Sequence, residues 1–319
     1  MGSLAVVAVG GNSLVRGGDA SMDAARAAIA ETADHLAAMA AAGWALAVTH
    51  GNGPQVGFGL LRSEAAAAVA PRLPLDVLGA ETQGSIGYML QQALDIALAR
   101  RGVARPVATV VTQVVVDPAD QAFSHPTKPI GPFYRAFEAD ELRRSRGWAM
   151  IEDAGRGWRR VVSSPEPLEI VEAPVVRALI SQGIVVIAAG GGGIPVVRRE
   201  TGYEGVEAVI DKDLASAVLA RDLGASLLVI STAVQRVALD YGTPAQRPIE
   251  TMTVADARRY LAEGQFPPGS MGPKIEAGIR FLEGGGEIVL ITTPHLIGDA
   301  LVGTAGTRME RLAAEEAVR

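Results

Sequence analysis

Apolar residues occur along the chain in two recurring patterns: short unbroken runs, and longer stretches in which they return every three or four positions. The short runs are typical of buried strands and the longer stretches of amphipathic helices. The runs predict strands at residues 4–9, 44–49, 107–116, 184–189, 227–231, 237–241 and 287–292. The periodic stretches predict helices at residues 24–42, 60–70, 76–101, 171–182, 209–221, 254–263 and 273–283, and a helical tail from residue 308.

The order of these elements predicts an α/β fold. The first helix has Ser21 as a plausible N-cap and Gly43 as a plausible residue just past its end, and it stands between two of the predicted strands. A strand, a helix and a second strand in sequence imply parallel pairing through a right-handed crossover. We therefore expect a largely parallel sheet covered by helices.

Glycine loops follow several of the predicted strands. Gly10, Gly11 and Asn12 follow the first strand, HGNGPQVG (50–57) follows the second, and Gly190 to Gly193 follow the strand at 184–189. Ligands of open parallel sheets bind beyond the carboxyl ends of the strands, and glycine N–H groups suit an anion such as phosphate. The alternative for the last loop is a tight turn before Pro195.

Residues 117–167 differ in composition from the rest of the chain. They contain many prolines, and near their end polar and apolar residues alternate as in a hairpin. They predict an excursion from the main sheet, a small β-rich flap. The aromatic residues Phe133, Tyr134, Trp148 and Trp158 are expected to form the small core of this flap rather than platforms for stacking bases.

Composition narrows the classes of function. The 319 residues suffice for one large α/β domain or two lobes, and the net charge of −6 argues against a nucleic-acid-binding protein. Without cysteine there is no thiolate metal site or cysteine nucleophile, and four histidines do not favour a histidine metal site, so we assign no metal ligand. No apolar segment approaches the roughly 18 residues of a membrane span, and the first residues do not resemble a leader peptide. We expect a cytoplasmic protein.

Three lysines stand beside glycine or proline at loops or helix starts: Lys128, Lys212 and Lys274. Phosphoryl transfer requires cations and backbone amides around the transferred group, usually with Mg²⁺, and little covalent chemistry from the protein. Asp211 could hold the lysines in place or assist the metal, or it could be an ordinary charge at a helix start. His50 could act as a general base or as a hydrogen-bonding strut. Because neither a Walker loop nor a spaced GxGxxG occurs, a phosphotransferase of another design is indicated.

Several segments together resemble the carbamate kinases of the amino-acid kinase superfamily, and the resemblance runs almost from end to end. They are VAVGGNSL (7–14), THGNGPQVG (49–57), TQGSIGYML (82–90), TQVVVDPADQAF (112–123), PTKPIGPFY (126–134), GRGWRRVV (155–162), AGGGGIPV (189–196), EAVIDKDLA (207–215) and GSMGPK (269–274). PTKPIGPFY and VIDKDLA are particular to carbamate kinases within that superfamily.

The resemblance implies a three-layer αβα sandwich in a single domain, a homodimer, and reversible transfer between ATP and carbamate, giving ADP and carbamoyl phosphate, with Mg²⁺. It assigns the acceptor to the half at 1–182, which includes the flap at about 117–167, and the nucleotide to the half at 183–319. The implied catalytic residues are Lys128, Lys212, Asp211 and Lys274, with Asp211 ordering the lysines. The implied acceptor contacts are Gly10, Gly11, Asn12, Gly51, Asn52 and Gly53. The implied nucleotide contacts are Gly190, Gly191, Gly192, Gly193, Tyr241, Met271 and Lys274.

One departure from the family pattern is Ala233, where relatives often carry an acidic residue or glycine, so the purine contacts are less defined by the sequence. Two alternatives stay open: a related kinase for another small carboxylate or phosphonate, and a catalytically silent nucleotide-binding regulator. The physiological direction is also open, although ATP formation from carbamoyl phosphate in arginine or purine catabolism is the usual role of the family.

Overall fold

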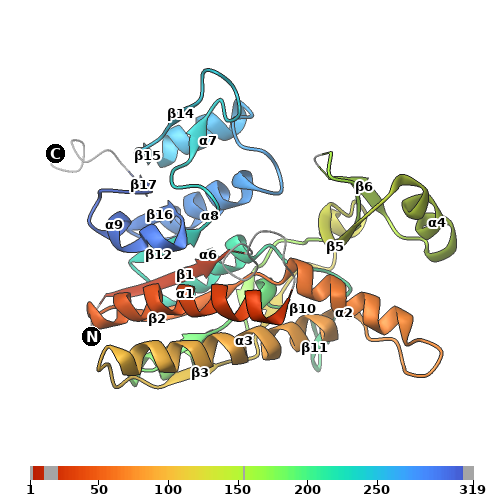
Figure 1. Cartoon of the computed structure of the whole chain (residues 1–319), viewed down its shortest axis with the longest axis horizontal. Helices are drawn as coiled ribbons and strands as arrows, with labels where there is room; N and C mark the ends of the chain where they lie inside the picture. Colours follow the sequence, from red (N-terminus) through yellow and green to blue (C-terminus); the bar gives the residue numbers. More distant parts are fainter. Residues whose placement is uncertain (1–2, 11–20, 154, 312–319) are drawn as a thin grey trace.

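A large, mostly parallel sheet forms the centre of the molecule (Figure 1). The computed structural model describes residues 3–10, 21–153 and 155–311. Within these ranges the sheet has eight strands, in spatial order β15 (Thr251–Thr253), β17 (Thr307–Glu310), β16 (Ile288–Thr292), β12 (Leu227–Ser231), β1 (Leu4–Val9), β2 (Ala45–His50), β9 (Val185–Ile187) and β3 (Val107–Thr109). Every neighbouring pair is parallel except β16 and β17. The predicted α/β class is confirmed.

Helices cover both faces of this sheet. On β1, Val7 packs into the core on one side and Val6 into the core on the other, which is why the strand reads as an unbroken apolar run. The first face is covered by α1 (Met22–Ala41), α3 (Leu75–Arg100) and α9 (Ile297–Leu301). The second face is covered by α5 (Ala173–Ser181), α6 (Lys212–Leu223), α7 (Val254–Ala262) and α8 (Met271–Glu283). These layers are the αβα sandwich that the resemblance implied.

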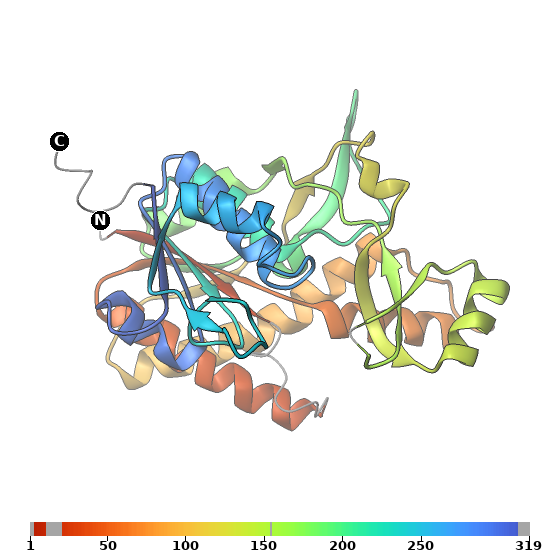
Figure 2. The ribbon, with the colours of Figure 1, turned by 90° about the horizontal axis from the view of Figure 1, so that it is seen from above.

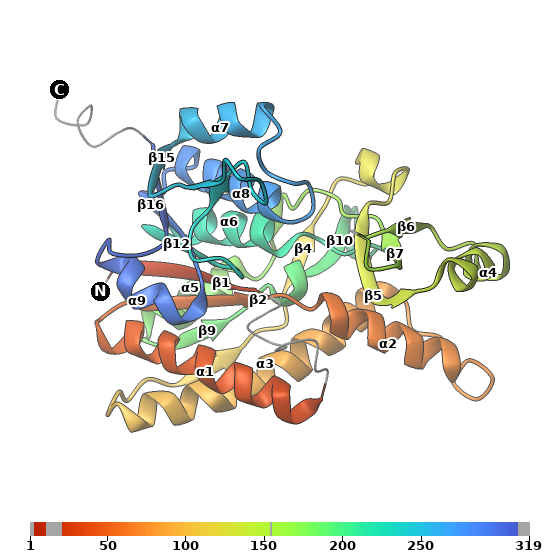
Figure 3. The same ribbon diagram turned by 45° about the horizontal axis from the view of Figure 1, so that its top comes forward.

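A second, smaller sheet joins the main sheet to the flap (Figure 3). Its strands, in order, are β11 (Gly202–Gly205), β10 (Ile194–Arg199), β4 (Gln113–Val115) and β8 (Glu169–Ile170). The single strand predicted at residues 107–116 is therefore wrong, because the chain leaves the main sheet between β3 and β4. Between these strands the buried Gln83 of α3 accepts from the Thr112 N–H at 2.7 Å and donates to the Thr112 carbonyl at 3.0 Å, and the same carbonyl accepts from the Ile194 N–H of β10 at 2.9 Å.

The flap is a small subdomain built on a sheet of its own. Its strands are β5 (Lys128–Tyr134), β7 (Trp158–Val162) and β6 (Met150–Glu152), joined by the helix α4 (Ala136–Arg146). The helix was not expected, because its sequence is polar around most of its circumference and only Ala139 is buried. The aromatic residues of the flap do not form a simple apolar core: arginine guanidinium groups stack on Phe133, Trp148 and Trp158.

The flap lies directly on helix α2 (Gly53–Ala65), as the view from above shows (Figure 2). A Cβ atom on Gly57 would come within 2.0 Å of the Gly131 Cα, so the two backbones touch at a point that admits no side chain on Gly57. Ile130 and Val162 of the flap share a small apolar core with Val56 of α2. The flap and α2 are therefore packed as one unit.

Three further predictions of local structure need correction. Helix α2 begins at Gly53 and ends at Ala65, rather than spanning 60–70, because Pro54 is compatible with the first helical turn. Arg308 lies in strand β17, not in a helix. The strand expected at 237–241 is limited to β13 (Ala238–Leu239), paired with β14 (Arg247–Pro248). Among the described helices, none is both long enough and apolar enough to cross a membrane.

Candidate active site

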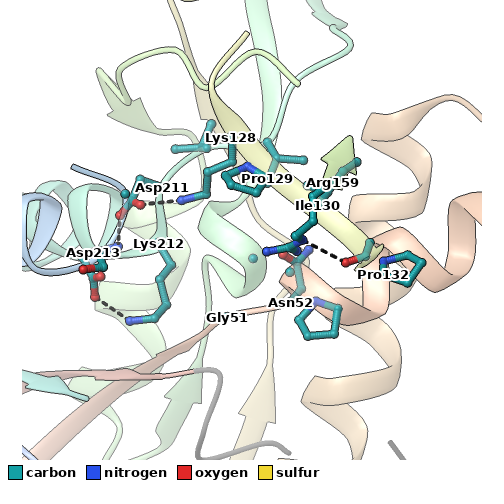
Figure 4. A pocket seen from close by; sticks show the side chains of 18 of the residues that line it. Gly51, Asn52, Lys128, Pro129, Ile130, Pro132, Arg159, Asp211, Lys212 and Asp213 are labelled. Atoms are coloured by element: carbon teal, nitrogen blue, oxygen red, sulfur yellow. Dashed lines mark hydrogen bonds and ion pairs between the residues drawn. The ribbon is translucent and has the colours of Figure 1, made fainter. Parts of the chain in front are cut away.

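A cavity of about 930 Å³ opens between the flap and the carboxyl-terminal half of the sheet (Figure 4). Its walls are the loop after β2, the first residues of α2, strand β5 of the flap, and the starts of α6 and α8. The cavity thus lies beyond the carboxyl ends of parallel strands, where open α/β sheets bind their ligands.

Three lysines and two aspartates line one side of this cavity. The Lys128 Nζ donates to Asp211 Oδ2 at 2.5 Å, and Asp213 accepts from Lys212 at 2.5 Å and from Lys274 at 2.7 Å. Three ammonium groups against two carboxylates leave one net positive charge. The group is therefore suited to an anion with several oxygens.

The start of helix α6 explains how this order arises from the sequence VIDKDLA. Asp211 is the N-cap residue, and its Oδ1 accepts from the N–H groups of Asp213 at 2.9 Å and Leu214 at 3.4 Å. Its other oxygen is left for Lys128, which comes from the flap. Lys212 is then the first helical residue, so it lies at a helix start whose dipole favours an anion.

The carboxylate that holds Lys212 and Lys274 is Asp213, not Asp211 as the sequence analysis expected. Asp213 is 3% exposed. Burial opposes its ionisation, but the neighbouring ammonium groups of Lys212 and Lys274 outweigh burial and hold the pKa of Asp213 well below its usual value. Burial also lowers the pKa of Lys212, against the opposite pull of Asp213. The group therefore depends on its two carboxylates staying charged.

Some of the acceptor-side residues predicted from the sequence line this cavity, and others do not. Gly51, Asn52 and Gly53 line it, opposite the lysines. The buried Asn52 donates from Nδ2 to Thr82 Oγ1 at 2.8 Å, which fixes its amide. Gly10 directly follows β1 but does not line the cavity: a Cβ atom on it would meet the Ser231 carbonyl oxygen at 2.6 Å, so packing against β12 accounts for this glycine. Gly11 and Asn12 lie outside the described residues.

The loop Gly190–Gly193 contributes one glycine to the cavity wall, Gly191. The others serve close packing, since a Cβ on Gly190 would meet His50 Nε2 at 2.3 Å and one on Gly192 would meet the Ile210 carbonyl oxygen at 2.4 Å. The N–H groups of Gly192 and Gly193 donate to the carbonyls of Ala189 and Gly190. They close a tight turn and are not directed to a phosphate, which corrects part of the expectation.

Two nucleotide-side candidates, Tyr241 and Met271, do not line the cavity that contains the lysines. Tyr241 is 62% exposed and lines a separate cavity of about 590 Å³ with Arg236 and Gln246. Met271 is the first residue of α8 and does not line the cavity that contains the lysines. Lys274, three residues later on the same helix, does line it.

His50 is buried behind the cavity wall and does not line it. Its Nδ1 is 3.0 Å from the Gly51 carbonyl oxygen, so Nδ1 is the protonated nitrogen and donates this bond. Burial lowers the pKa of His50 to about 4, with Lys212 adding to the effect against the bond to Gly51. A neutral histidine without access to the cavity fits the strut, not the general base.

Two residues that face or organise the site were not singled out by sequence reasoning, Asp213 and Arg159. Asp213 stands two residues after Asp211 and next to Lys212. Its contact with Lys274 forms only because α6 and α8 pack together. Arg159 belongs to GRGWRRVV and reaches the cavity from strand β7. Within the described ranges, no group of three or more histidine, aspartate or glutamate side chains is arranged to hold a metal ion.

Comparison with known proteins agrees with the geometry. The model of the amino acid kinase family matches residues 3–293. The chain is 51% identical to the carbamate kinase-like protein YahI of Escherichia coli K12, covering 97% of this chain and 99% of that protein. It is 47% identical to the carbamate kinase of Thermococcus kodakarensis, covering 96% and 98%. The structure of Giardia lamblia carbamate kinase bound to AMP-PNP superposes with a TM-score of 0.89 at 42% identity, covering 97% of this chain and 98% of that one. The chain therefore belongs to the amino acid kinase family and, within it, to the carbamate kinases.

Proposed function

We propose that this protein is a carbamate kinase, an ATP-dependent phosphotransferase that reversibly converts ATP and carbamate to ADP and carbamoyl phosphate. The observation that carries the proposal is the group of Lys128, Lys212 and Lys274, held by two carboxylates across one cavity from the Gly51–Gly53 loop. A cationic wall opposite a small polar loop is what transfer between a polyphosphate and a small acceptor requires.

In this proposal the lysines stabilise the charge on the phosphoryl oxygens during transfer. Lys212 and Lys274 act from the helix starts of the nucleotide side, and Lys128 acts from the flap over the acceptor. Their carboxylate partners fix each ammonium group before substrate arrives, so little reorganisation is needed at the moment of transfer. Asn52 and the glycines beside it hold the acceptor in line with the phosphoryl group.

Mg²⁺ belongs to the proposed reaction as a companion of the nucleotide. Asp211 and Asp213, the carboxylates in the cavity wall, are both paired with lysines. Because their oxygens already bind lysines, these carboxylates fit a Mg²⁺ ion that is held mainly by phosphate oxygens and water, with at most one of the two carboxylates nearby. When bound, the ion would neutralise phosphate charge.

The nucleotide side is proposed to include Gly191 and Lys274 at the phosphates, with Tyr241 and Met271 toward the base. The cavity beside Tyr241 is of a size for a base, since ligand sites of small molecules are commonly about 300–1,000 Å³. The acceptor side is the half at 1–182 and the nucleotide side the half at 183–319. The protein is further proposed to be cytoplasmic and to form ATP in arginine or purine catabolism.

A homodimer is also proposed, and three exposed apolar side chains on α3 support it. Val77, Tyr88 and Ile96 are 40%, 57% and 48% exposed on this helix. Exposed apolar residues on one element are what a subunit interface would cover. Sedimentation equilibrium of the wild type and a Tyr88→Glu variant would test the proposal, with a monomeric wild type contradicting it.

Acceptor choice is the experiment that tests the proposed function against its alternatives. ADP formation from Mg·ATP should be measured with carbamate, generated from ammonia and bicarbonate, and separately with acetate and methylphosphonate. Turnover confined to carbamate is expected. Preference for another carboxylate or a phosphonate would indicate a related kinase, and nucleotide binding with no turnover of any acceptor would indicate a regulator.

A further inference from the structure

The flap contributes a guanidinium group to the cavity as well as the Lys128 ammonium group. Arg159 of β7 lines the cavity with its side chain 16% exposed. Its Nε donates to the Gly131 carbonyl oxygen at 3.1 Å and its Nη1 to Asp153 Oδ2 at 3.2 Å. Figure 4 shows the side chain reaching from the flap toward the loop of Gly51 and Asn52, with Lys212 and Asp213 on the opposite side of the view.

The charge of Arg159 is only partly neutralised. Asp153 is shared with Arg156, whose Nη2 donates to the other carboxylate oxygen at 3.1 Å. Two guanidinium groups and one carboxylate leave a net positive charge at the flap end of the cavity. Within the described part of the chain, Arg159 Nη2 donates to no acceptor, so it has hydrogen-bonding capacity left for a ligand.

Packing holds the guanidinium group in place. The Phe133 ring lies 4.8 Å from the Arg156 guanidinium carbon and 5.3 Å from that of Arg159, so the two arginines share one aromatic ring. The neighbouring Arg160 instead stacks on Trp148 at 4.5 Å and does not line the cavity, as alternation along a strand requires. The backbone contact between Gly57 and Gly131 brings this part of the flap down onto α2.

We propose that Arg159, supported by Phe133 and Arg156, forms an oxyanion subsite at the flap end of the cavity, separate from the lysine group. Its ligand is the carboxylate of the acceptor in the forward reaction and the carbonyl oxygen of the acyl phosphate in reverse. Arg159 Nη2, which the described bonds leave available, can donate to one oxygen of the acceptor while Nε and Nη1 stay anchored on the flap. Arg159 is thus a binding residue for the acceptor, while the lysines serve the phosphoryl group. The inference rests on the proposed function.

Steady-state kinetics of Arg159→Met test the subsite. The KM for carbamoyl phosphate should rise at least tenfold, because hydrogen bonds to charged groups contribute about 1.5–3 kcal/mol, while the KM for ADP changes less than twofold. Arg159→Lys should recover part of the loss, because lysine keeps the charge but cannot make both bonds that hold the Arg159 guanidinium group on Gly131 and Asp153. Arg144→Gln is the matched control. It removes another positive charge of the flap, from a side chain that donates to the Asp140 carbonyl oxygen, and both KM values should equal those of wild type. An equal rise in both KM values, or no rise, would overturn the proposal.

A binding measurement separates this inference from the proposed function. Bicarbonate is a planar analogue of carbamate and can be titrated calorimetrically into the enzyme saturated with Mg·AMP-PNP. Wild type and Arg144→Gln should bind bicarbonate, and Arg159→Met should bind it at least tenfold more weakly. If wild type makes no ATP from carbamoyl phosphate, the proposed function fails but this titration still reports on the subsite. Absent binding to wild type, or equal binding to Arg159→Met, would refute the subsite.

Discussion

Replacing Asp213 by asparagine tests whether the lysine group is held by a buried carboxylate. The substitution keeps the size of the side chain but removes the charge that Lys212 and Lys274 share at 2.5 and 2.7 Å. The Asp213 side chain is 4% exposed, so solvent cannot replace the lost partner. Lys212 and Lys274, which are 12% and 15% exposed, would then face each other as like charges.

The expected loss of stability follows from this burial. Removing one partner of a buried ion pair costs about 3–5 kcal/mol, because the other charge is left uncompensated. For a chain of this length roughly 2–3 °C of Tm corresponds to 1 kcal/mol, so Tm should fall by about 6–15 °C. Turnover should fall as well, because the two ammonium groups lose their fixed positions.

Thermal unfolding at pH 7 is the assay, with Asp222→Asn as the matched control. Asp222 pairs with Arg221 near the end of the same helix, and Arg221 is 46% exposed, so this surface pair is worth at most about 1 kcal/mol. The control should lose no more than about 3 °C. Equal Tm values for both variants would refute the reasoning.

The pH dependence gives a second check on the same residue. The pKa of Asp213 is lower in the folded protein than its ordinary value of 3.8. Its stabilising contribution is therefore fully present above about pH 4 and is lost only as the pH falls further. The difference between wild type and Asp213→Asn should stay constant from pH 7 to about pH 4.5. A difference that already disappears at pH 6 would contradict the assignment.

Three further predictions concern the lysines, the flap and the buried histidine. Lys212→Ala should lower kcat about 10²- to 10³-fold while changing Tm by much less than Asp213→Asn does, measured by coupled ATP formation and thermal unfolding; an unchanged kcat would remove Lys212 from the mechanism. Gly57→Ala should separate the flap from α2, because the new Cβ would come within 2.0 Å of Gly131, and hydrogen exchange of flap amides should rise; unchanged exchange would contradict the rigid contact. Between about pH 6.5 and pH 4 the folded protein keeps His50 neutral while the unfolded chain takes up a proton, so the free energy of unfolding should fall by up to about 1.4 kcal/mol per pH unit. His50→Gln should remove this contribution and make the fall less steep. The same slope in both proteins would show that His50 does not titrate as described.

The sequence predicted the central sheet well where a strand is buried on both faces. The strands at Leu4–Val9 and Leu227–Ser231 have the predicted bounds, because an apolar run that ends in glycine or a polar residue has few other ways to be buried. It failed at residues 107–116, where the buried side chain of Gln83 accepts the hydrogen bond of the Thr112 N–H between β3 and β4. Such a pairing depends on tertiary contacts and leaves no local signal.

The candidate site was predictable in its residue types but not in its pairings. Lys128, Lys212 and Lys274 were selected by their positions at loops and helix starts, and they do line one cavity. The roles of Asp211 and Asp213 could not be separated in advance, because one Asp211 oxygen caps α6 and only the packing of α6 on α8 brings Lys274 to Asp213. The sequence also cannot distinguish a glycine that contacts a ligand from a glycine that is needed for close packing. Gly190 is an example of the second kind, because it packs against the His50 side chain.

The most direct test of the central claim is ATP formation from ADP and carbamoyl phosphate by the purified protein with Mg²⁺, compared with Lys212→Ala prepared in the same way. Wild type should form ATP in proportion to the carbamoyl phosphate consumed, and Lys212→Ala should bind ADP while forming ATP at least a hundredfold more slowly. Folded wild-type protein that binds ADP and forms no ATP above the uncatalysed rate would contradict the account.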